Sequence, residues 1–375
     1  MEGSTADHRW SAVDFRIMIV VGFSVRATIE SLKRIGVEDL IAIDFFGDWD
    51  LYKLTHRVRI VRSLKELKEI LLFHSEERII YSSILENHLD ILKPVQERVL
   101  GNGVSAVKLV RPGKAWWSLA TSLGVRIPRF SLDGLTDGSE WLIKPFKSGG
   151  GRNIYLWRKG MKVKRGYYLQ EFVRGKSISF LFLANGKDFL PLGYTRQLIG
   201  FRELGGDNFK WCGNIYPYRI EGSLRDRIED WVGRIVEKSG LVGLNGMDII
   251  LGEDGPYIIE INPRYTASME LLERAHDIKL MEMHLLACRG ELPVINISVP
   301  ERYYGKGIVY AERSLTAFKC EEMWERGFRD ITRREEIVPK GRPVCSIYSQ
   351  GKDEDEVIRG LLEEKAWLYE RGVEG

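Results

Sequence analysis

The segment between residues 243 and 264 contains side chains that could hold a metal ion. Two runs with strand character, 245–251 and 257–262, flank a turn rich in Gly, Asp and Pro, which is typical of a β-hairpin. If the last residue of the first run pairs with the first residue of the second, Asp248 stands directly opposite Glu260. Because side chains alternate along a strand, Asn262 then points to the same side as Glu260. The sequence therefore predicts two carboxylates and one amide on a single face of the hairpin.

Two acids that face each other across a sheet repel by about 0.2–1 kcal/mol when exposed, and by more as water is excluded, so we expect a positive charge between them. Asp248, Glu260 and Asn262 offer oxygen atoms, with no His or Cys beside them. Such a set suits Mg²⁺ or Mn²⁺ held together with substrate phosphates. Arg264 follows two residues after Asn262 and is expected to face the same site. The alternative is an ordinary hairpin with solvated acids; for the whole set of four residues we prefer the metal site.

A glycine-rich turn supplies a second possible binding element. Gly149, Gly150 and Gly151 follow Ser148, and consecutive glycines allow backbone N–H groups to converge on an anion. Lys144 lies four residues before Ser148 inside an apolar run, where a lysine is unfavourable unless its charge meets a partner. The segment lacks the P-loop pattern, and by itself such a turn is more often a flexible hairpin tip. Together with Lys144, it predicts a phosphate site.

The first hundred residues predict an open α/β sheet. Phe15–Phe23 and Leu40–Phe46 read as strands, Ala27–Ile35 as the helix between them, and His88–Val99 as a later helix. Gly22 at the end of the first strand invites a dinucleotide-binding interpretation, but the second and third glycines of that motif are absent, so we favour a plain βαβ unit.

Four polar residues follow predicted strands in this region, where open α/β sheets tend to place ligands: Arg26, Glu86, Asn87 and His88. For each of them alone we favour a solvated loop residue.

The rest of the chain predicts antiparallel sheet, one helix with an apolar stripe and a terminal helix that runs from acidic to basic residues. Strand-like runs continue at 141–145, 167–173, 177–184 and 189–198, and an apolar stripe with helical spacing begins at Ile228. From residue 292 onward, further short strands precede a terminal helix that begins at Asp353.

Composition excludes several classes of protein. The 375 residues are 44% hydrophobic and 29% charged, which excludes extended disorder, and the net charge of +3 is too small for a nucleic-acid protein that relies on a dense basic field. The four cysteines form no C-x-x-C pair, which predicts neither a zinc ribbon nor a disulfide scaffold. No apolar run approaches 18 residues. We therefore expect a cytoplasmic protein without nucleic-acid or membrane partners.

The order of these motifs resembles the ATP-grasp superfamily. The chain shows, in turn, Ile143-Lys144-Pro145, the glycine loop 148–152, the stretch 170–173 (QEFV), and D-x₁₁-E-x-N-P-R from Asp248 to Arg264. The likeness is greatest to uncharacterised ATP-dependent carboligase-like proteins related to biotin carboxylase. It implies an α/β fold with a Rossmann-like pre-ATP-grasp domain at 1–105 and a small C-terminal α/β domain at 289–375. The ATP-grasp domain between them, at 106–288, is implied to be α+β, with subdomains at about 106–173 and 174–288.

The resemblance also implies roles for individual residues. Lys114 and Lys144 would contact the ATP phosphates, and Arg264 would steady the transferring phosphoryl group and the acid substrate, so Lys144 and Arg264 are the implied catalytic residues. Asp248, Glu260 and Asn262 would hold two Mg²⁺ (or Mn²⁺) ions. The remaining ATP-binding residues implied are Ser148, Gly149, Gly150, Gly151, Glu171, Phe172, Val173 and Ser177. At the position of Ser177, many members of the superfamily have an acid that binds the ribose hydroxyls.

The implied reaction is phosphorylation of a carboxylate to an acyl phosphate, followed by attack of an amine and release of ADP and phosphate. The partners are then a small-molecule carboxylate and an amine, and a homodimer is one expected assembly because it is the commonest. Two alternatives stay open: a ligase that activates bicarbonate, and an ATP-binding regulatory protein without turnover. Biotin carboxylase has a glutamate base after its arginine, whereas this chain reads Arg264-Tyr265-Thr266-Ala267-Ser268. Glu270 could replace that base, but we expect it to be solvated.

Overall fold

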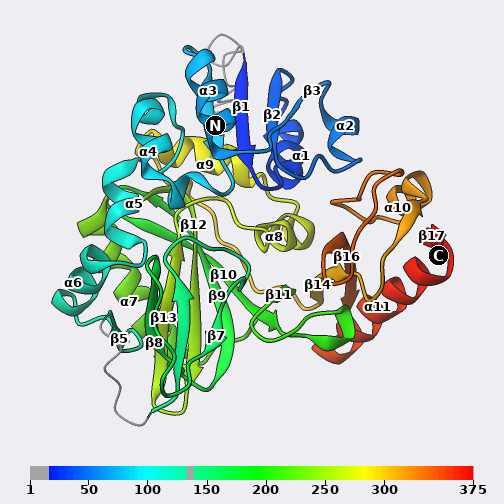
Figure 1. The fold of residues 1–375 in the computed structure, drawn as a ribbon. Coiled ribbons are helices and arrows are strands. Elements are labelled where there is room, and N and C mark those ends of the chain that lie inside the picture. The colour runs from blue at the N-terminus through cyan, green and yellow to red at the C-terminus, as the bar shows by residue number, and fades with distance from the viewer. Residues whose placement is uncertain (1–16, 133–138, 375) are drawn as a thin grey trace, which may run out of the picture.

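The structure is a computed structural model that describes residues 17–132 and 139–374. Its N-terminal part is a parallel sheet of four strands in the order β3-β2-β1-β4, blue in Figure 1. The strands are β1 (Met18–Gly22), β2 (Leu40–Asp44), β3 (Arg57–Ile60) and β4 (Arg78–Tyr81), and the helices are α1 (Arg26–Arg34), α2 (Leu51–Leu54), α3 (Leu64–Phe73) and α4 (Leu89–Leu92). The predicted βαβ unit is confirmed, although the part of the predicted first strand before residue 17 lies outside the described residues. The predicted helix 88–99 is instead the short α4 followed by a 3₁₀ segment (Lys93–Arg98).

A small antiparallel sheet carries the glycine-rich turn. Its order is β5-β8-β6-β7, and the turn joins β6 to β7. Its strands are β5 (Phe130–Ser131), β6 (Trp141–Pro145), β7 (Tyr155–Leu156) and β8 (Tyr167–Glu171), and helices α5 (Val104–Val110) and α6 (Lys114–Ser122) precede it. Trp117 of α6 stacks on Phe130, with 3.7 Å between the ring centroids, and so holds the helix against the sheet.

A seven-stranded sheet in the order β13-β12-β9-β10-β11-β14-β16 forms the largest layer. It contains β9 (Lys176–Asn185), β10 (Phe189–Ile199), β11 (Trp211–Tyr216), β12 (Val242–Gly252), β13 (Gly255–Asn262), β14 (Tyr303–Tyr310) and β16 (Pro343–Gly351). All of its neighbouring strands pair antiparallel. Because β14 and β16 continue the sheet beyond β11, the sheet runs without a break across the predicted domain boundary near residue 288.

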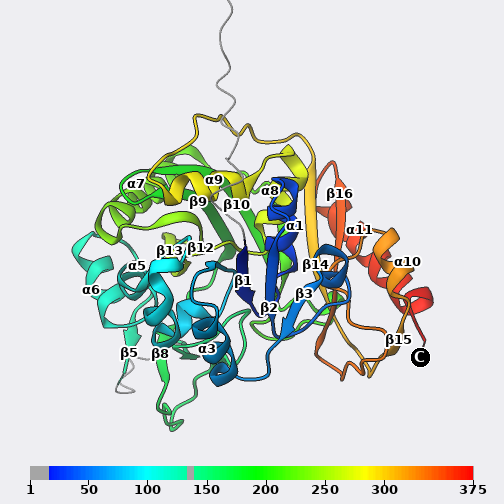
Figure 2. The ribbon, with the colours of Figure 1, turned by 90° about the horizontal axis from the view of Figure 1, so that it is seen from above.

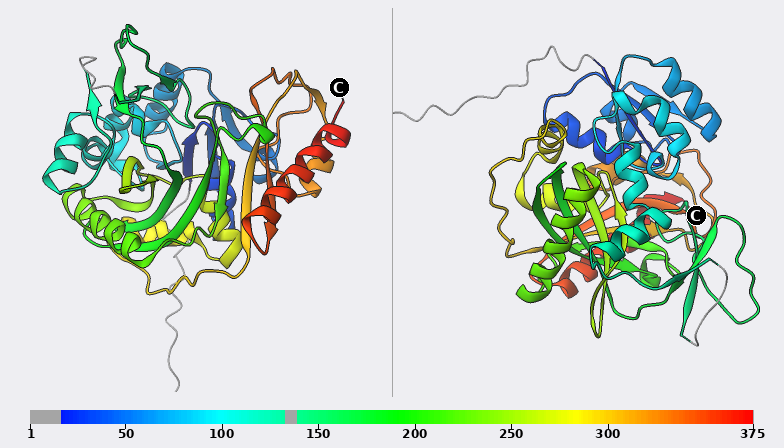
Figure 3. Two further views of the ribbon diagram at one scale, coloured as in Figure 1. Left: turned by 90° about the horizontal axis from the view of Figure 1, so that it is seen from below. Right: turned by 90° about the vertical axis from the view of Figure 1, so that its left-hand side faces the viewer.

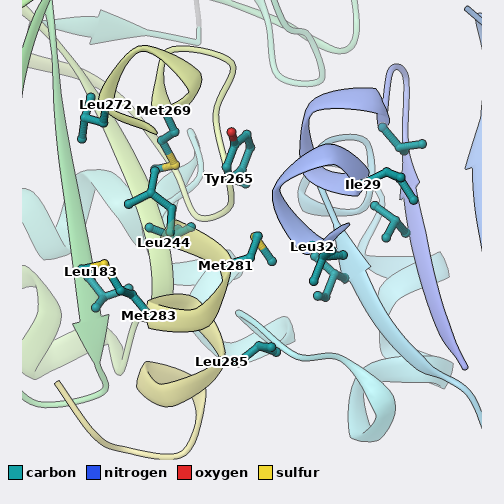
Figure 4. Close-up of a cluster of buried hydrophobic side chains, with 14 of the residues drawn as sticks. Ile29, Leu32, Leu183, Leu244, Tyr265, Met269, Leu272, Met281, Met283 and Leu285 are labelled. Carbon is teal, nitrogen blue, oxygen red and sulfur yellow. The ribbon is translucent and has the colours of Figure 1, made fainter. Parts of the chain in front are cut away.

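Helices cover this sheet and join it to the parallel one. The predicted stripe on α7 (Gly222–Ser239) is confirmed, because Ile228, Val232 and Ile235 are all buried in the same core as Phe180 of β9. Figure 4 shows Ile29 and Leu32 of α1 facing α9 (Leu280–Cys288), while α8 (Met269–His276) lies beside them. Figure 2 shows the same arrangement from above.

The C-terminal part packs against the last two strands of the large sheet. It contains β15 (Thr316–Phe318), α10 (Cys320–Glu325), α11 (Glu354–Trp367) and β17 (Val373–Glu374). The predicted start of the last helix at Asp353 is confirmed, since its carboxylate caps α11 by accepting from the Glu356 N–H at 2.8 Å. Figure 3 shows α11, in red, alongside β14 and β16. Among the described residues, no helix is long and apolar enough to cross a membrane.

Candidate active site

One cavity of about 1050 Å³ is bordered by both the parallel and the antiparallel sheets. The site residues predicted from the sequence that line it are Lys144, Ser148, Gly149, Gly150, Gly151, Glu171, Phe172, Val173, Ser177, Asp248, Glu260, Asn262 and Arg264. The fold therefore brings the hairpin, the glycine loop and the segment after β8 to one place. Lys114 is the exception: it is exposed at the start of α6 and does not line the cavity.

The two carboxylates of the hairpin stand opposite each other because β13 contains a bulge. Asp248 pairs with Glu260, but Ile249 pairs with Ile258, so Ile259 is the extra residue. The predicted pairing of Asp248 with Glu260 is confirmed. The predicted pairing of Leu251 with Tyr257 is wrong, since Leu251 pairs with Pro256. Ile258 and Ile261 are both in the core, and the bulge is what permits both of them to point inward.

Asp248 is fixed by neutral hydrogen-bond donors. Its carboxylate accepts from the Ser179 hydroxyl at 2.9 Å, from Gln197 Nε2 at 2.8 Å and from Asn262 Nδ2 at 3.2 Å. Burial, followed by the charge of Glu260, raises the pKa of Asp248 to about 6. Ionised Asp248 is therefore an anion with no cation in direct contact among the described residues, and a bound cation would stabilise it.

Glu260 is paired with a residue that the sequence analysis did not single out. Arg111 Nη1 donates to Glu260 and also to the Ile261 carbonyl at 3.2 Å, while its Nη2 donates to Asn87 at 2.7 Å. Burial favours the neutral form of Glu260, but Arg111 and Lys144 outweigh it and hold the pKa of Glu260 below its ordinary value. Arg111 directly follows the last residue of α5. In the sequence, only its position shortly before Lys114 could have pointed to Arg111 as a site residue.

Lys144 lies close to the carboxylate pair. It is 7% exposed and its ammonium donates to Gln170 Oε1 at 3.2 Å. Burial lowers the pKa of Lys144, and the charges of Glu260 and Asp248 oppose that shift. The buried lysine thus faces acids and the cavity, where an anionic ligand would stabilise its charged form.

The glycine loop rests against the connection between β10 and β11. Gly151 has φ +73°, and a Cβ there would lie 1.7 Å from the Phe209 carbonyl oxygen. The Trp211 N–H donates to the Gly150 carbonyl at 3.1 Å. Gly151 is therefore required both by its backbone conformation and by this close approach.

The segment at the end of β8, residues 171–173, uses part of its backbone in hydrogen bonds within the protein. The Glu171 N–H donates to the Arg129 carbonyl, and the Phe172 N–H to the Glu140 carbonyl, both at 2.8 Å. Within the described residues, Val173 is the member of the predicted trio whose N–H has no such partner. A ligand edge at this segment would therefore meet the Val173 N–H and the backbone carbonyls.

Arg264 is positioned from the N-terminal part of the chain. Its Nε donates to Glu86 at 2.7 Å, and its Nη2 donates to Asn262 at 3.3 Å. Glu86 is 3% exposed and its second oxygen has no hydrogen-bond partner among the described residues. The expectation that Glu86 and Arg26 are solvated is therefore wrong, because both side chains are buried in ion pairs. The other two residues of that set, Asn87 and His88, line the cavity.

The expectation that Glu270 is solvated is also wrong. Glu270 is buried between Arg26, at 2.5 Å, and Lys306. It does not line the cavity. This carboxylate is thus already neutralised by two cations of the protein.

The donor set fits a divalent cation that prefers oxygen. Asp248 and Glu260 contribute carboxylates on one face, and Asn262 contributes an amide whose N–H₂ points to Asp248 and whose oxygen points to Arg264. No cluster of three or more His, Cys, Asp or Glu side chains suited to a metal occurs in the described residues. Mg²⁺ commonly takes only one or two protein carboxylates and completes its shell with water and phosphate oxygens, which matches this pair.

The sequence is similar to one family model and to several known proteins. Residues 118–268 match the family model described as ATP-grasp domain. The chain is 23% identical to an uncharacterized protein of Methanocaldococcus jannaschii, over 94% of this chain and 93% of that protein. It is 29% identical to tyramine–L-glutamate ligase of the same organism, over 50% of this chain and 53% of that enzyme.

A solved structure extends the likeness to nearly the whole chain. The biotin carboxylase domain of Hydrogenobacter thermophilus 2-oxoglutarate carboxylase superimposes with a TM-score of 0.73 at 16% identity, covering 96% of this chain and 91% of that domain. That domain is a dimer in complex with MgADP, ADP and bicarbonate. The predicted resemblance and fold class are confirmed: the chain has the ATP-grasp fold of biotin carboxylase and related ligases, with an ATP-grasp domain in its central part.

Proposed function

We propose that this protein is an ADP-forming ligase that joins a carboxylate to an amine through an acyl phosphate. The observation that carries the proposal is the composition of one cavity wall. Asp248 stands opposite Glu260 there, and the buried Lys144, the glycine loop and Arg264 line the same space. The relative named tyramine–L-glutamate ligase, whose name describes the joining of an amine to an acid, supports this reaction class.

ATP is assigned to the part of the cavity between the small sheet and the hairpin. Lys144 and the glycine loop would bind its phosphates, because a buried ammonium and converging N–H groups both stabilise anionic oxygens. Ser148 and Ser177 line the same part, and the backbone at Glu171, Phe172 and Val173 would meet the adenine edge. We replace Lys114 by Arg111 as the second cation near the phosphates, since Arg111 lines the cavity.

Asp248, Glu260 and Asn262 would hold Mg²⁺ (or Mn²⁺). The metal would neutralise the charge that develops on the phosphate oxygens during phosphoryl transfer. The protein contributes the orientation of these ligands: Ser179 and Gln197 fix Asp248, and Arg111 fixes Glu260.

In the first step a carboxylate oxygen of the acid bonds to the γ-phosphorus, and the bond to the bridging oxygen of ADP breaks. In the second step the protonated amine first gives up one proton to water, and its free nitrogen then bonds to the acyl carbon. The bond between that carbon and the phosphate oxygen breaks, inorganic phosphate leaves, and the nitrogen loses a second proton to the phosphate. Arg264 would hold the acid and the transferring phosphoryl group. Its ion pair with Glu86 fixes the direction of its guanidinium.

The experiment is an ADP-release screen over mixtures of carboxylates and amines. We expect ADP release that needs an acid, Mg²⁺ and an amine, and that is lost in Glu260→Gln. Glu253→Gln, an exposed position in the turn of the same hairpin, is the matched control and should retain activity. Release that depends on bicarbonate alone would instead identify a carboxylating ligase. Tight ATP binding without ADP release over the whole panel would identify a regulatory protein and reject the ligase.

A further inference from the structure

The cavity has a second charged wall, formed by the parallel sheet, α1 and the C-terminal part of the chain. Ser24 and Asp48 follow the carboxyl ends of β1 and β2, Thr28 lies on α1, and Lys306 and Asp330 belong to the C-terminal third of the chain. All five line the cavity. The carboxyl ends of parallel strands are where open α/β sheets place ligands, so this wall is a candidate binding surface.

Two cations of this region, Arg26 and Lys306, are shared among several acids; besides the contacts below, Arg26 pairs with Glu30 at 2.7 Å and lies 3.7 Å from Asp50. Arg26 donates to Glu270 at 2.5 Å and grips Asp330 with Nε and Nη2, both at 3.0 Å. Lys306 pairs with Glu270 and lies 3.7 Å from Asp330. Within the described residues, neither cation forms an ion pair with Asp48.

Two other acids are satisfied by the backbone. Asp44 accepts from the N–H groups of Val25, Phe46 and Gly47 at 2.6–2.8 Å. Asp50 accepts from two N–H groups of the C-terminal part, both at 2.9 Å. Both carboxylates therefore have a structural role between the loops that they connect.

Unlike these acids, Asp48 has neither a cation nor a set of backbone N–H donors as partners of its carboxylate among the described residues. It is 8% exposed, and within the described residues its carboxylate contacts only the Ser24 hydroxyl, at 3.2 Å. That hydroxyl also lies 3.3 Å from Asp330, and its one hydrogen serves a single acceptor. Burial, and then the charges of Asp44, Asp330 and Asp50, raise the pKa of Asp48 well above its ordinary value. The anion is thus unfavourable unless a cation from outside the protein joins it.

Thr28 provides an independent observation on the same wall. Its side-chain oxygen is buried and has no hydrogen-bond partner among the described residues, although it lines the cavity. A buried hydroxyl without a partner is unfavourable, so such a group usually bonds to an ordered water, an ion or a ligand.

We propose that Ser24, Thr28 and Asp48 bind the ammonium group of the amine substrate. An alkylammonium has three N–H donors, which suit one carboxylate and two hydroxyl acceptors. Ionised Asp48 would repel a second carboxylate or bicarbonate at this end of the cavity. The proposal rests on the ligase function above and adds to it the class and location of the second substrate: a primary amine, held at the carboxyl ends of β1 and β2.

The test measures direct binding and needs neither ATP nor an acid. Isothermal titration at constant ionic strength compares n-butylammonium and tyramine hydrochloride with n-butanol as the neutral analogue. The variants are Asp48→Asn, Thr28→Val and the matched control Asp39→Asn, which removes an exposed carboxylate before the opposite end of β2. Thr28→Val keeps the shape of the side chain and removes the unpartnered oxygen, so it should fold even if Asp48→Asn does not.

We expect both ammonium ions to bind the wild-type protein more tightly than butanol. Affinity should fall by about tenfold or more in Asp48→Asn, by about threefold in Thr28→Val, and remain unchanged in Asp39→Asn. Equal affinity for butanol and butylammonium, equal affinity in wild type and Asp48→Asn, or displacement of butylammonium by Mg²⁺ would overturn the ammonium site.

The ADP-release screen separates the two proposals. If the wild-type protein releases ADP with an acid and an amine but shows no ammonium binding that depends on Asp48, the ligase stands and this subsite is wrong. If ammonium binds through Asp48 and no acid elicits ADP release, the ligase assignment is wrong. The bound ammonium is then not the ammonium group of an amine substrate.

Discussion

Asp248 and Glu260 face each other across β12 and β13 because Ile259 is bulged out of the pairing between them. The bulge turns Glu260 to the cavity while Ile258 and Ile261 both remain in the core. Arg111, from another part of the chain, then pairs with Glu260 and limits the repulsion between the two acids. This geometry leads to the first of four predictions.

Glu260→Gln should abolish ADP release and also destabilise the fold. Arg111 would lose its acid while its side chain is only 10% exposed, and breaking a mostly buried pair by removing one partner costs about 3–5 kcal/mol. The double variant Glu260→Gln/Arg111→Gln should regain part of the unfolding free energy without regaining activity. Urea unfolding of the two single variants and the double variant checks this; additive losses of stability would contradict the pairing.

Gly151→Ala should weaken ATP binding. The added methyl group would lie 1.7 Å from the Phe209 carbonyl oxygen, so the glycine loop must move away from the β10–β11 connection. Gly160→Ala is the matched control, since Gly160 also has a positive φ, of +91°, but a Cβ there meets nothing within 4 Å. We expect the Kd for ATP, measured by titration, to rise by about tenfold in the first variant and to change little in the second. An equal effect in both would show that only backbone strain matters.

Lys144→Met should raise the KM for ATP and lower kcat. The substitution keeps an unbranched apolar chain in a site that is 7% exposed, and it removes the buried cation beside Glu260 and Asp248. A fall in kcat/KM of about 100-fold is expected, of the size found when one electrostatic donor is removed from an active site. Lys187→Met, at an exposed position outside the cavity, should have no effect. Unchanged ATP kinetics in Lys144→Met would remove this residue from the phosphate site.

Glu270→Gln should destabilise the protein in a pH-dependent way. Burial favours the neutral acid, but Arg26 and Lys306 outweigh it and lower the pKa of Glu270 from 4.5 to about 2. A carboxyl whose pKa is lower in the folded state contributes stability above pH 4.5 and loses it as the pH falls toward 2. The difference in unfolding free energy between wild type and variant should therefore be constant from about pH 5 to pH 8 and shrink below that range. Urea unfolding of wild type and variant over this pH range tests the prediction, with the exposed Glu363→Gln as control. A difference in unfolding free energy that is constant at all pH values would reject the ion pairs.

The sequence by itself determined the features that depend on neighbours along the chain. The alternation around Asp248 and Glu260 gives the hairpin, and the spacing of Ile228, Val232 and Ile235 gives α7. Both follow because strand and helix periods are fixed by local backbone geometry, which every segment carries in its own residues. The order of the glycine loop, Lys144 and the hairpin was likewise enough to identify the fold.

Only the tertiary structure decided which distant charges meet. Arg111 contacts Glu260 across 149 residues, Glu86 contacts Arg264 across 178, and Arg26 contacts Glu270 across 244. A charged residue has the same local sequence signal whether it is solvated or buried in an ion pair, so the sequence alone predicts solvated positions for Arg26, Glu86 and Glu270. The choice between these states is made by the packing of the parallel sheet, the large sheet and the C-terminal part, because burial without a partner is too unfavourable to persist.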